Sequence, residues 1–133
     1  MQARVLVVRG DGGREWLGDK MRDAGAQIEF VRAYRRVLPQ WSAEQQALVE
    51  RALTAPQHTV WLLSSSQAVG NLRQLLPQST WSRALAWVTH ERIAHAARAI
   101  GFGSVHTVAP TLHDVVVQWG RSIQSSAPSD QRP

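Results

Sequence analysis

The first residues that could do chemistry form a glycine-rich turn near the start of the sequence. The apolar run Val5–Val8 is followed by Gly10, Gly12 and Gly13, and a helical pattern begins at Arg14. A strand, a tight turn and a helix start in this order direct backbone N–H groups and the positive end of a helix dipole toward one point. This arrangement favours the binding of an anion.

The turn does not match the nucleotide-binding motifs. The dinucleotide motif needs a third glycine where this chain has Glu15, and the lysine-containing phosphate loop is absent. A structural interpretation stands beside the anion site, because a strand-to-helix turn often needs glycine for a positive φ or for close helix packing. The residues alone leave both interpretations open.

Hydroxyl-bearing residues form a second group of candidates. Ser64–Ser66 follows an apolar strand, but it lacks the flanking glycines of a serine nucleophile turn, and no Asp–His pair is placed to activate it. Tyr34, the one tyrosine of the chain, comes at the end of another predicted strand. Its chemistry fits either a general acid or an amphipathic residue that packs at the edge of the fold.

The histidines and acidic residues do not form a metal-binding pattern. His90 and His95 are one residue further apart than the zinc motif H-E-x-x-H allows, which turns the second histidine about 140° around a helix. The chain has no cysteine, which excludes disulfides and thiolate chemistry. Of the acidic residues, only Asp11 lies at a predicted strand end, where a divalent cation would need several. We therefore expect no metal and no cofactor.

The composition is that of a globular protein with an excess of arginine. Of the 133 residues 44% are hydrophobic, and 15 Lys+Arg against 10 Asp+Glu give a net charge of +5. Arginine suits carboxylate or phosphate ligands. The sequence lacks, however, the continuous basic stripe that would indicate nucleic-acid binding. No apolar run reaches the ~18 residues of a membrane span, and no signal-peptide pattern is present. We expect a cytoplasmic protein that binds neither nucleic acid nor membrane.

The hydrophobic pattern alternates between strands and helices along the chain. It predicts an α/β fold with a doubly wound, flavodoxin-like parallel sheet of order 2-1-3-4-5 and helices on both faces. Ligands of such sheets bind at the carboxyl ends of the strands. The expected strands are Val5–Val8, Ile28–Ala33, Thr59–Leu63, Ala84–Val88 and Val105–Val108.

Local signals mark where the predicted helices begin and end. Gly25 should end the first helix and Gly101 the fourth. Ser42 and Gln45 have the spacing of a capping box at the start of the second helix. The polar, proline-bearing stretch from 125 to 133 reads as a disordered tail.

Several stretches of the sequence resemble a known enzyme family in order and spacing. The chain resembles the C-terminal half of the uroporphyrinogen-III synthase family over nearly its whole length, to about Gln124. The stretches that carry the resemblance are Val5–Glu15, Leu17–Gly18, Gly25–Ala26, Ala33–Arg36, Leu62–Val69 and Arg92–Ala97.

The resemblance implies a particular division of the chain. Members of this family have two α/β lobes joined by a two-stranded linker. Residues 1–33 would then be a β-α-β segment of one lobe, 34–41 the linker, and 42–124 most of the other lobe. Three arrangements follow for a chain of this length. It closes on itself as one sheet, exchanges segments with a second copy, or is completed by a separate N-terminal half.

The resemblance also implies a reaction. The family cyclises hydroxymethylbilane to uroporphyrinogen III, inverting the last pyrrole ring, in tetrapyrrole (heme) biosynthesis without metal or cofactor. Tyr34 takes the position of the family's cleft tyrosine, which is proposed to assist loss of the substrate hydroxyl. The substrate's eight carboxylates would be bound by the residues of the turns, namely Arg9, Gly12, Gly13, Arg14, Ser64, Ser65, Thr89 and Arg92.

A second hypothesis belongs to another class of protein. The chain would be a non-catalytic anion-binding or assembly domain descended from the same fold. About half of the family's cleft is missing from a chain of this length, and this favours the non-catalytic alternative.

Overall fold

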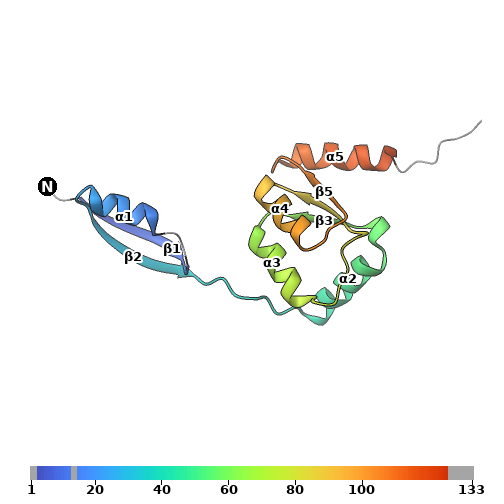
Figure 1. Cartoon of the computed structure of the whole chain (residues 1–133), viewed down its shortest axis with the longest axis horizontal. Helices are drawn as coiled ribbons and strands as arrows, with labels where there is room; N and C mark the ends of the chain where they lie inside the picture. Colours follow the sequence, from blue (N-terminus) through green and yellow to red (C-terminus); the bar gives the residue numbers. More distant parts are fainter. Residues whose placement is uncertain (1–2, 13–14, 126–133) are drawn as a thin grey trace, which may run out of the picture. The chain divides into compact units, whose positions relative to one another are not determined.

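The computed structural model describes residues 3–12 and 15–125. The chain divides into two compact units, Met1–Pro39 and Gln40–Pro133. In Figure 1 the first unit is drawn in blue to cyan, and the second runs from green to red. No helix in the described ranges is long and apolar enough to cross a membrane.

The first unit is a single β-α-β element. It consists of β1 (Arg4–Gly10), α1 (Trp16–Asp23) and β2 (Gln27–Tyr34), and the two strands are parallel. Gly25 has a φ of +86° and follows the helix end, where the N–H groups of Gly25 and Ala26 donate to the carbonyls of Arg22 and Met21. This pair of hydrogen bonds is a Schellman motif, so the helix end predicted at Gly25 is confirmed.

The first unit buries very little apolar surface. Val5, Val7 and Phe30 are half-buried on one face of the strand pair, while Leu6 and Val8 are exposed on the other. Among the described residues of this unit, only Gly10 and Gly18 are buried. A two-stranded element with one helix and no buried side chain is marginally stable in water.

The second unit contains the remaining elements. Its strands form one parallel sheet of order β3-β4-β5. Ser42 and Gln45 make both hydrogen bonds of the predicted capping box at the start of α2. The elements are α2 (Ala43–Thr54), η1 (Pro56–His58), β3 (Val60–Leu63), α3 (Ser66–Leu75), β4 (Leu85–Val88), α4 (Glu91–Ala99), β5 (Ser104–Thr107) and α5 (Leu112–Ser125).

The hydrophobic core belongs to the second unit. Every buried hydrophobic residue of the described chain lies between Leu63 and Val108. Side chains of α3 and α4 pack against β3 and β4 in one cluster. Trp81 stacks on Phe102 with ring centroids 4.8 Å apart and meets Trp61 edge to face at 5.2 Å. Such aromatic pairs add stability beyond the area that they bury.

The predicted α/β class with parallel strands is confirmed, and so is the adjacency of strands 2-1 and 3-4-5. The described strands form two sheets, β1-β2 and β3-β4-β5. Residues 35–42 between β2 and α2 have no regular structure and connect the two units. The tail predicted from 125 on falls almost wholly on residues 126–133, which lie outside the described ranges, although Ser125 itself ends α5.

Two glycines of the second unit give a matched test of its packing. A β-carbon at Gly103 would lie 1.8 Å from the backbone oxygen of Ser82, whereas one at Gly70 within α3 would meet nothing within 4 Å. We expect Gly103→Ala to lower the free energy of unfolding by about 2–3 kcal/mol because the chain must move. Gly70→Ala should raise it by about 0.5–1 kcal/mol through helix propensity. Urea unfolding followed by circular dichroism measures both, and equal effects would contradict this packing.

Candidate functional site

Tyr34 owes its position to an irregularity in the strand pair. Arg9 is paired with Arg32, but the next residue of β1, Gly10, is paired with Tyr34, so Ala33 is an extra residue in β2. A β-bulge of this kind bends the strand and re-aims the side chains that follow it. The bulge therefore decides which residue of β2 lies opposite Gly10.

The Tyr34 ring lies against the backbone of Gly10. A β-carbon added at Gly10 would lie 2.4 Å from Cε2 and 2.6 Å from Cζ of Tyr34. Gly10 is buried, while Tyr34 is 51% exposed. Glycine at position 10 thus creates the space that the ring occupies, and the rest of the ring remains open to solvent.

Asp11 and Arg36 fix the surroundings of the tyrosine. The N–H of Asp11 donates to the carbonyl of Tyr34 at 3.2 Å, and the Asp11 carboxylate accepts from the N–H of Arg36 at 3.1 Å. The guanidinium of Arg36 donates to the Tyr34 hydroxyl oxygen at 3.4 Å and lies 5.7 Å from the ring centroid. Asp11 therefore ties the glycine turn to the segment that carries both side chains.

This geometry gives the tyrosine the features of a proton donor. Because Arg36 donates to the phenol oxygen, the O–H of Tyr34 is available to a group outside. The site can therefore protonate a leaving group that approaches the end of β2.

The intramolecular partners of Arg9 include Phe30 and Glu15. Its guanidinium lies 4.3 Å from the Phe30 ring centroid, and an Nη atom is 3.5 Å from a carboxylate oxygen of Glu15. Phe30 in turn packs against Gly18 of α1. Substrate binding by Arg9 therefore stays a prediction, and an incoming anion would compete with Glu15.

The other predicted residues of the glycine turn are only partly described. Gly12 has a φ of +72°, a left-handed conformation that glycine adopts without strain. The prediction that the turn needs glycine for a positive φ is therefore confirmed at Gly12. Anion binding by Gly12 stays a prediction. Gly13 and Arg14 lie outside the described residues.

In the second unit, the serines follow β3 at the start of α3. Ser65 is the N-cap, and its Oγ accepts hydrogen bonds from the N–H groups of Gln67 at 3.2 Å and Ala68 at 3.4 Å. Ser64 is exposed beside it. Ser65 therefore already has a structural role as a helix cap. Because its Oγ accepts these two hydrogen bonds, Ser65 could bind a substrate carboxylate only by donating its O–H.

Thr89, His90 and Arg92 follow β4 in the corresponding way. The N–H of Thr89 donates to the carbonyl of Leu63 at 3.2 Å, which ties the carboxyl ends of the two strands together. His90 is the N-cap of α4, and its Nδ1 accepts from the N–H of Arg92 at 3.0 Å. The structure thus brings Ser64, Ser65, Thr89 and Arg92 to one edge of the sheet.

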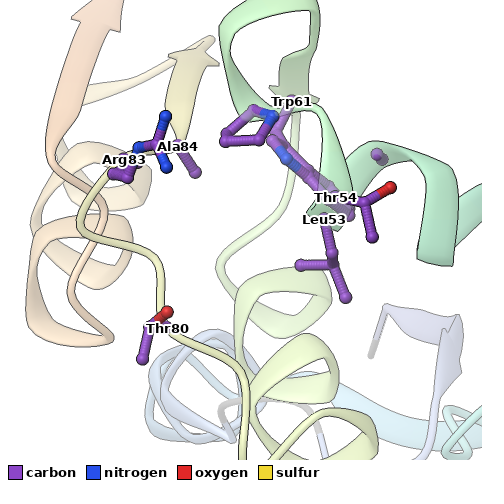
Figure 2. Close-up of a pocket in the computed structure, with 8 residues that line it drawn as sticks. Leu53, Thr54, Trp61, Thr80, Arg83 and Ala84 are labelled. Carbon is purple, nitrogen blue, oxygen red and sulfur yellow. The ribbon is translucent and has the colours of Figure 1, made fainter.

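The candidates therefore form two groups in two units. Arg9, Gly12 and Tyr34 belong to the first unit, and the serines with Thr89 and Arg92 belong to the second. A cavity of about 150 Å³ lies elsewhere in the second unit, between α2 and the start of β4 (Figure 2). Trp61, Arg83 and Ala84 line it at the amino ends of the strands, and none of the predicted site residues does.

Asp11 and Arg36 were missing from the predicted site. The sequence signal was present, because both lie beside predicted site residues and at predicted strand ends. What the sequence does not show is the bulge that sets Tyr34 opposite Gly10 and so brings Asp11 and Arg36 around it.

Gly10→Ala should displace the Tyr34 ring with little effect on stability, since the clash is with a movable side chain. Tyr34 is the chain's one tyrosine, so a ring-labelled sample gives a single tyrosine NMR signal that should shift and broaden. Gly120→Ala in α5, where an added β-carbon meets nothing within 4 Å, is the control and should leave the signal in place. An unmoved signal in Gly10→Ala would contradict the described packing.

Comparison with known proteins bears out the resemblance found in the sequence. The profile of the family described as Uroporphyrinogen-III synthase HemD matches residues 1–116. The uroporphyrinogen-III synthase of Escherichia coli strain K12 is 28% identical over 122 residues, which cover 86% of this chain and 47% of that relative. The enzyme of the same name from Salmonella typhimurium strain LT2 is 28% identical over 119 residues, with the same coverage. The chain thus spans about half the length of the curated relatives it matches. Because the family profile extends over most of the sequence, the chain belongs to the uroporphyrinogen-III synthase family.

Proposed function

We propose that this chain forms part of a uroporphyrinogen-III synthase cleft, which cyclises hydroxymethylbilane to uroporphyrinogen III. The observation that carries the proposal is the Tyr34 site. A single tyrosine lies over Gly10 at a strand's carboxyl end, with the guanidinium of Arg36 against its oxygen. The names of the relatives support the same reaction.

The proposed role of Tyr34 is to protonate the leaving hydroxyl of the substrate. The C–O bond of the hydroxymethyl group breaks, the hydroxyl leaves as water with the proton from the phenol, and an azafulvene electrophile remains. The substituted α-carbon of the last pyrrole ring then bonds to the azafulvene carbon, and the bond from that α-carbon to the neighbouring methylene bridge breaks. The free α-carbon of the same ring bonds to this bridge carbon and loses its proton, which closes the macrocycle with the ring inverted. Over the whole reaction one water is lost and the proton returns to Tyr34.

The turn residues would bind the carboxylates of the substrate. Arg92 offers a guanidinium, Ser64 and Thr89 offer hydroxyls, and all three lie at the edge where α3 and α4 begin. The positive ends of helix dipoles favour carboxylates at such an edge. In the first unit Gly12 and Arg9, together with Gly13 and Arg14, would serve the same purpose.

We further propose that the two units correspond to parts of the family's two lobes. Residues 1–33 would belong to one lobe, 34–41 to the linker, and 42–124 to the other. The division of the structure after Pro39 supports this assignment.

A second candidate function is favoured by the same division. The candidate residues lie in two units, and the chain spans about half of its relatives. Alone, it would then be a non-catalytic anion-binding or assembly domain. The isomer of the product separates the candidates, because hydroxymethylbilane closes spontaneously to uroporphyrinogen I.

The first test is to give the purified chain hydroxymethylbilane and to determine the isomers by chromatography. We expect uroporphyrinogen III above the level of an enzyme-free sample. Type I alone would contradict synthase activity of the chain as it stands and favour the non-catalytic alternative.

The second test replaces Tyr34 by Phe. Loss of a general acid should lower turnover at least about tenfold, while the unfolding curve should hardly change because the hydroxyl is exposed. Arg36→Gln should lower turnover by a smaller factor. Its neighbour Arg35 is an exposed arginine, so Arg35→Gln serves as the matched control and should stay within about twofold of the wild type. Unchanged turnover in Tyr34→Phe would remove the proposed role.

A further inference from the structure

The four strand edges that flank the two sheets differ in composition. At the outer edges, β2 carries Glu29 and Arg32, and β5 is Ser-Val-His-Thr. At the other edges, the middle of β1 is Val5–Val8 and the whole of β3 is Val60–Leu63, and neither stretch has a polar residue. Charged and polar residues protect edge strands from pairing, whereas continuous apolar runs are typical of strands inside a parallel sheet. Both β1 and β3 therefore have the sequence of interior strands.

The exposure of three residues that are paired across the second sheet also indicates that β3 lacks a neighbouring strand on its outer side. Leu62, Trp87 and His106 are paired across β3, β4 and β5. Trp87 in the central strand is 3% exposed, whereas Leu62 at the β3 edge is 52% exposed. Leucine at this position lacks the neighbouring strand that would cover it.

The edge of β1 in the first unit needs a neighbouring strand more than the edge of β3 does. None of the first unit's described side chains is buried, and Leu6 and Val8 of β1 are exposed on the face away from Phe30 and α1. Pairing β1 with β3 would turn a two-stranded sheet into a five-stranded one. It would also bury the edge of β1 and give the first unit a core.

The helices of the two units are compatible with this pairing. Crossovers between parallel strands are right-handed, so in the order 2-1-3-4-5 α1 lies on one face of the sheet and α3 and α4 on the other. The exposed face of β1 would then continue the face that α3 and α4 cover. Leu53 of α2 packs at that same core, and Leu48, earlier in α2, is 59% exposed.

We propose that two copies of this chain form a dimer in which β1 of each copy pairs in parallel with β3 of the other. Each end of the dimer is then a five-stranded sheet of order 2-1-3-4-5, with only the polar edges of β2 and β5 left open. The contact is the same in both directions, so it closes as a twofold dimer. A second copy suits this role because each chain carries both apolar edges, β1 in the first unit and β3 in the second.

The dimer would complete the candidate site. In a parallel sheet all carboxyl ends lie at one edge, so Tyr34 of one chain would join the edge that holds Ser64, Thr89 and Arg92 of the other. The dimer would form whether or not the chain is a synthase, so its failure and the failure of the proposed activity are separate results.

The first experiment compares two lysine substitutions in the same residue row. Sedimentation equilibrium of the wild type should give twice the 14.8 kDa mass of one chain. Leu62→Lys puts a charge on the apolar edge and should weaken the dimer at least about tenfold. His106→Lys, at the polar edge of β5, is the matched control and should leave the mass unchanged. Circular dichroism checks that both variants keep the fold of the second unit. A wild-type mass of one chain at about 100 μM, or equal masses for the two variants, would overturn the proposal.

The second experiment locates the contact. The chain has no cysteine, so single cysteines can be introduced cleanly. A chain with Val5→Cys or Val7→Cys is mixed with a chain with Leu62→Cys and oxidised. These positions share one face of the proposed sheet, so a disulfide between the two chains is expected. Arg32→Cys, at the outer edge of β2, is the control and should not link to Leu62→Cys. Linking at Arg32 but at neither valine would overturn the proposal. So would a disulfide that forms only when both cysteines are on one chain.

Discussion

The carboxyl end of a parallel strand and the start of the helix that follows it must lie at the same edge of the sheet. Everything that can do chemistry in this chain depends on that constraint. It places Ser65 and His90 as N-caps at one edge of the second unit, and it sets Gly10 and Asp11 beside the end of β2 in the first. The polar residues are far apart in the sequence, and parallel pairing brings them to two edges.

Much of the fold could be predicted from the sequence because its signals are local. The capping box at Ser42 and the glycine ends at Gly25 and Gly101 each depend on a few neighbouring residues, and each forms as expected. The separation into two sheets could not be predicted in this way. Whether β1 lies beside β3 depends on contacts between residues far apart in the sequence. The hydrophobic pattern of each strand would be the same whether its neighbouring strand came from the same chain or from another one.

The candidate site was predictable to a lesser degree. Residue type and strand ends were enough to single out Tyr34, Ser65 and Thr89. The contacts of Arg9 with Phe30 and Glu15 depend on packing under α1, which no spacing rule describes. The bulge at Ala33 is also invisible in the sequence, since the alternation of β2 looks regular. Chemistry-bearing residues could thus be chosen from the sequence, whereas their partners could not.

The uneven distribution of the core has a consequence for how the chain behaves at different concentrations. The second unit contains the whole buried cluster of the described residues, whereas no side chain that the structure describes in the first unit is buried. A unit with so little burial gains stability from whatever docks on it, so the fraction of ordered Tyr34 sites rises with the concentration of that partner. A chain of this design would lose order at Tyr34 on dilution while the core of its second unit stays folded.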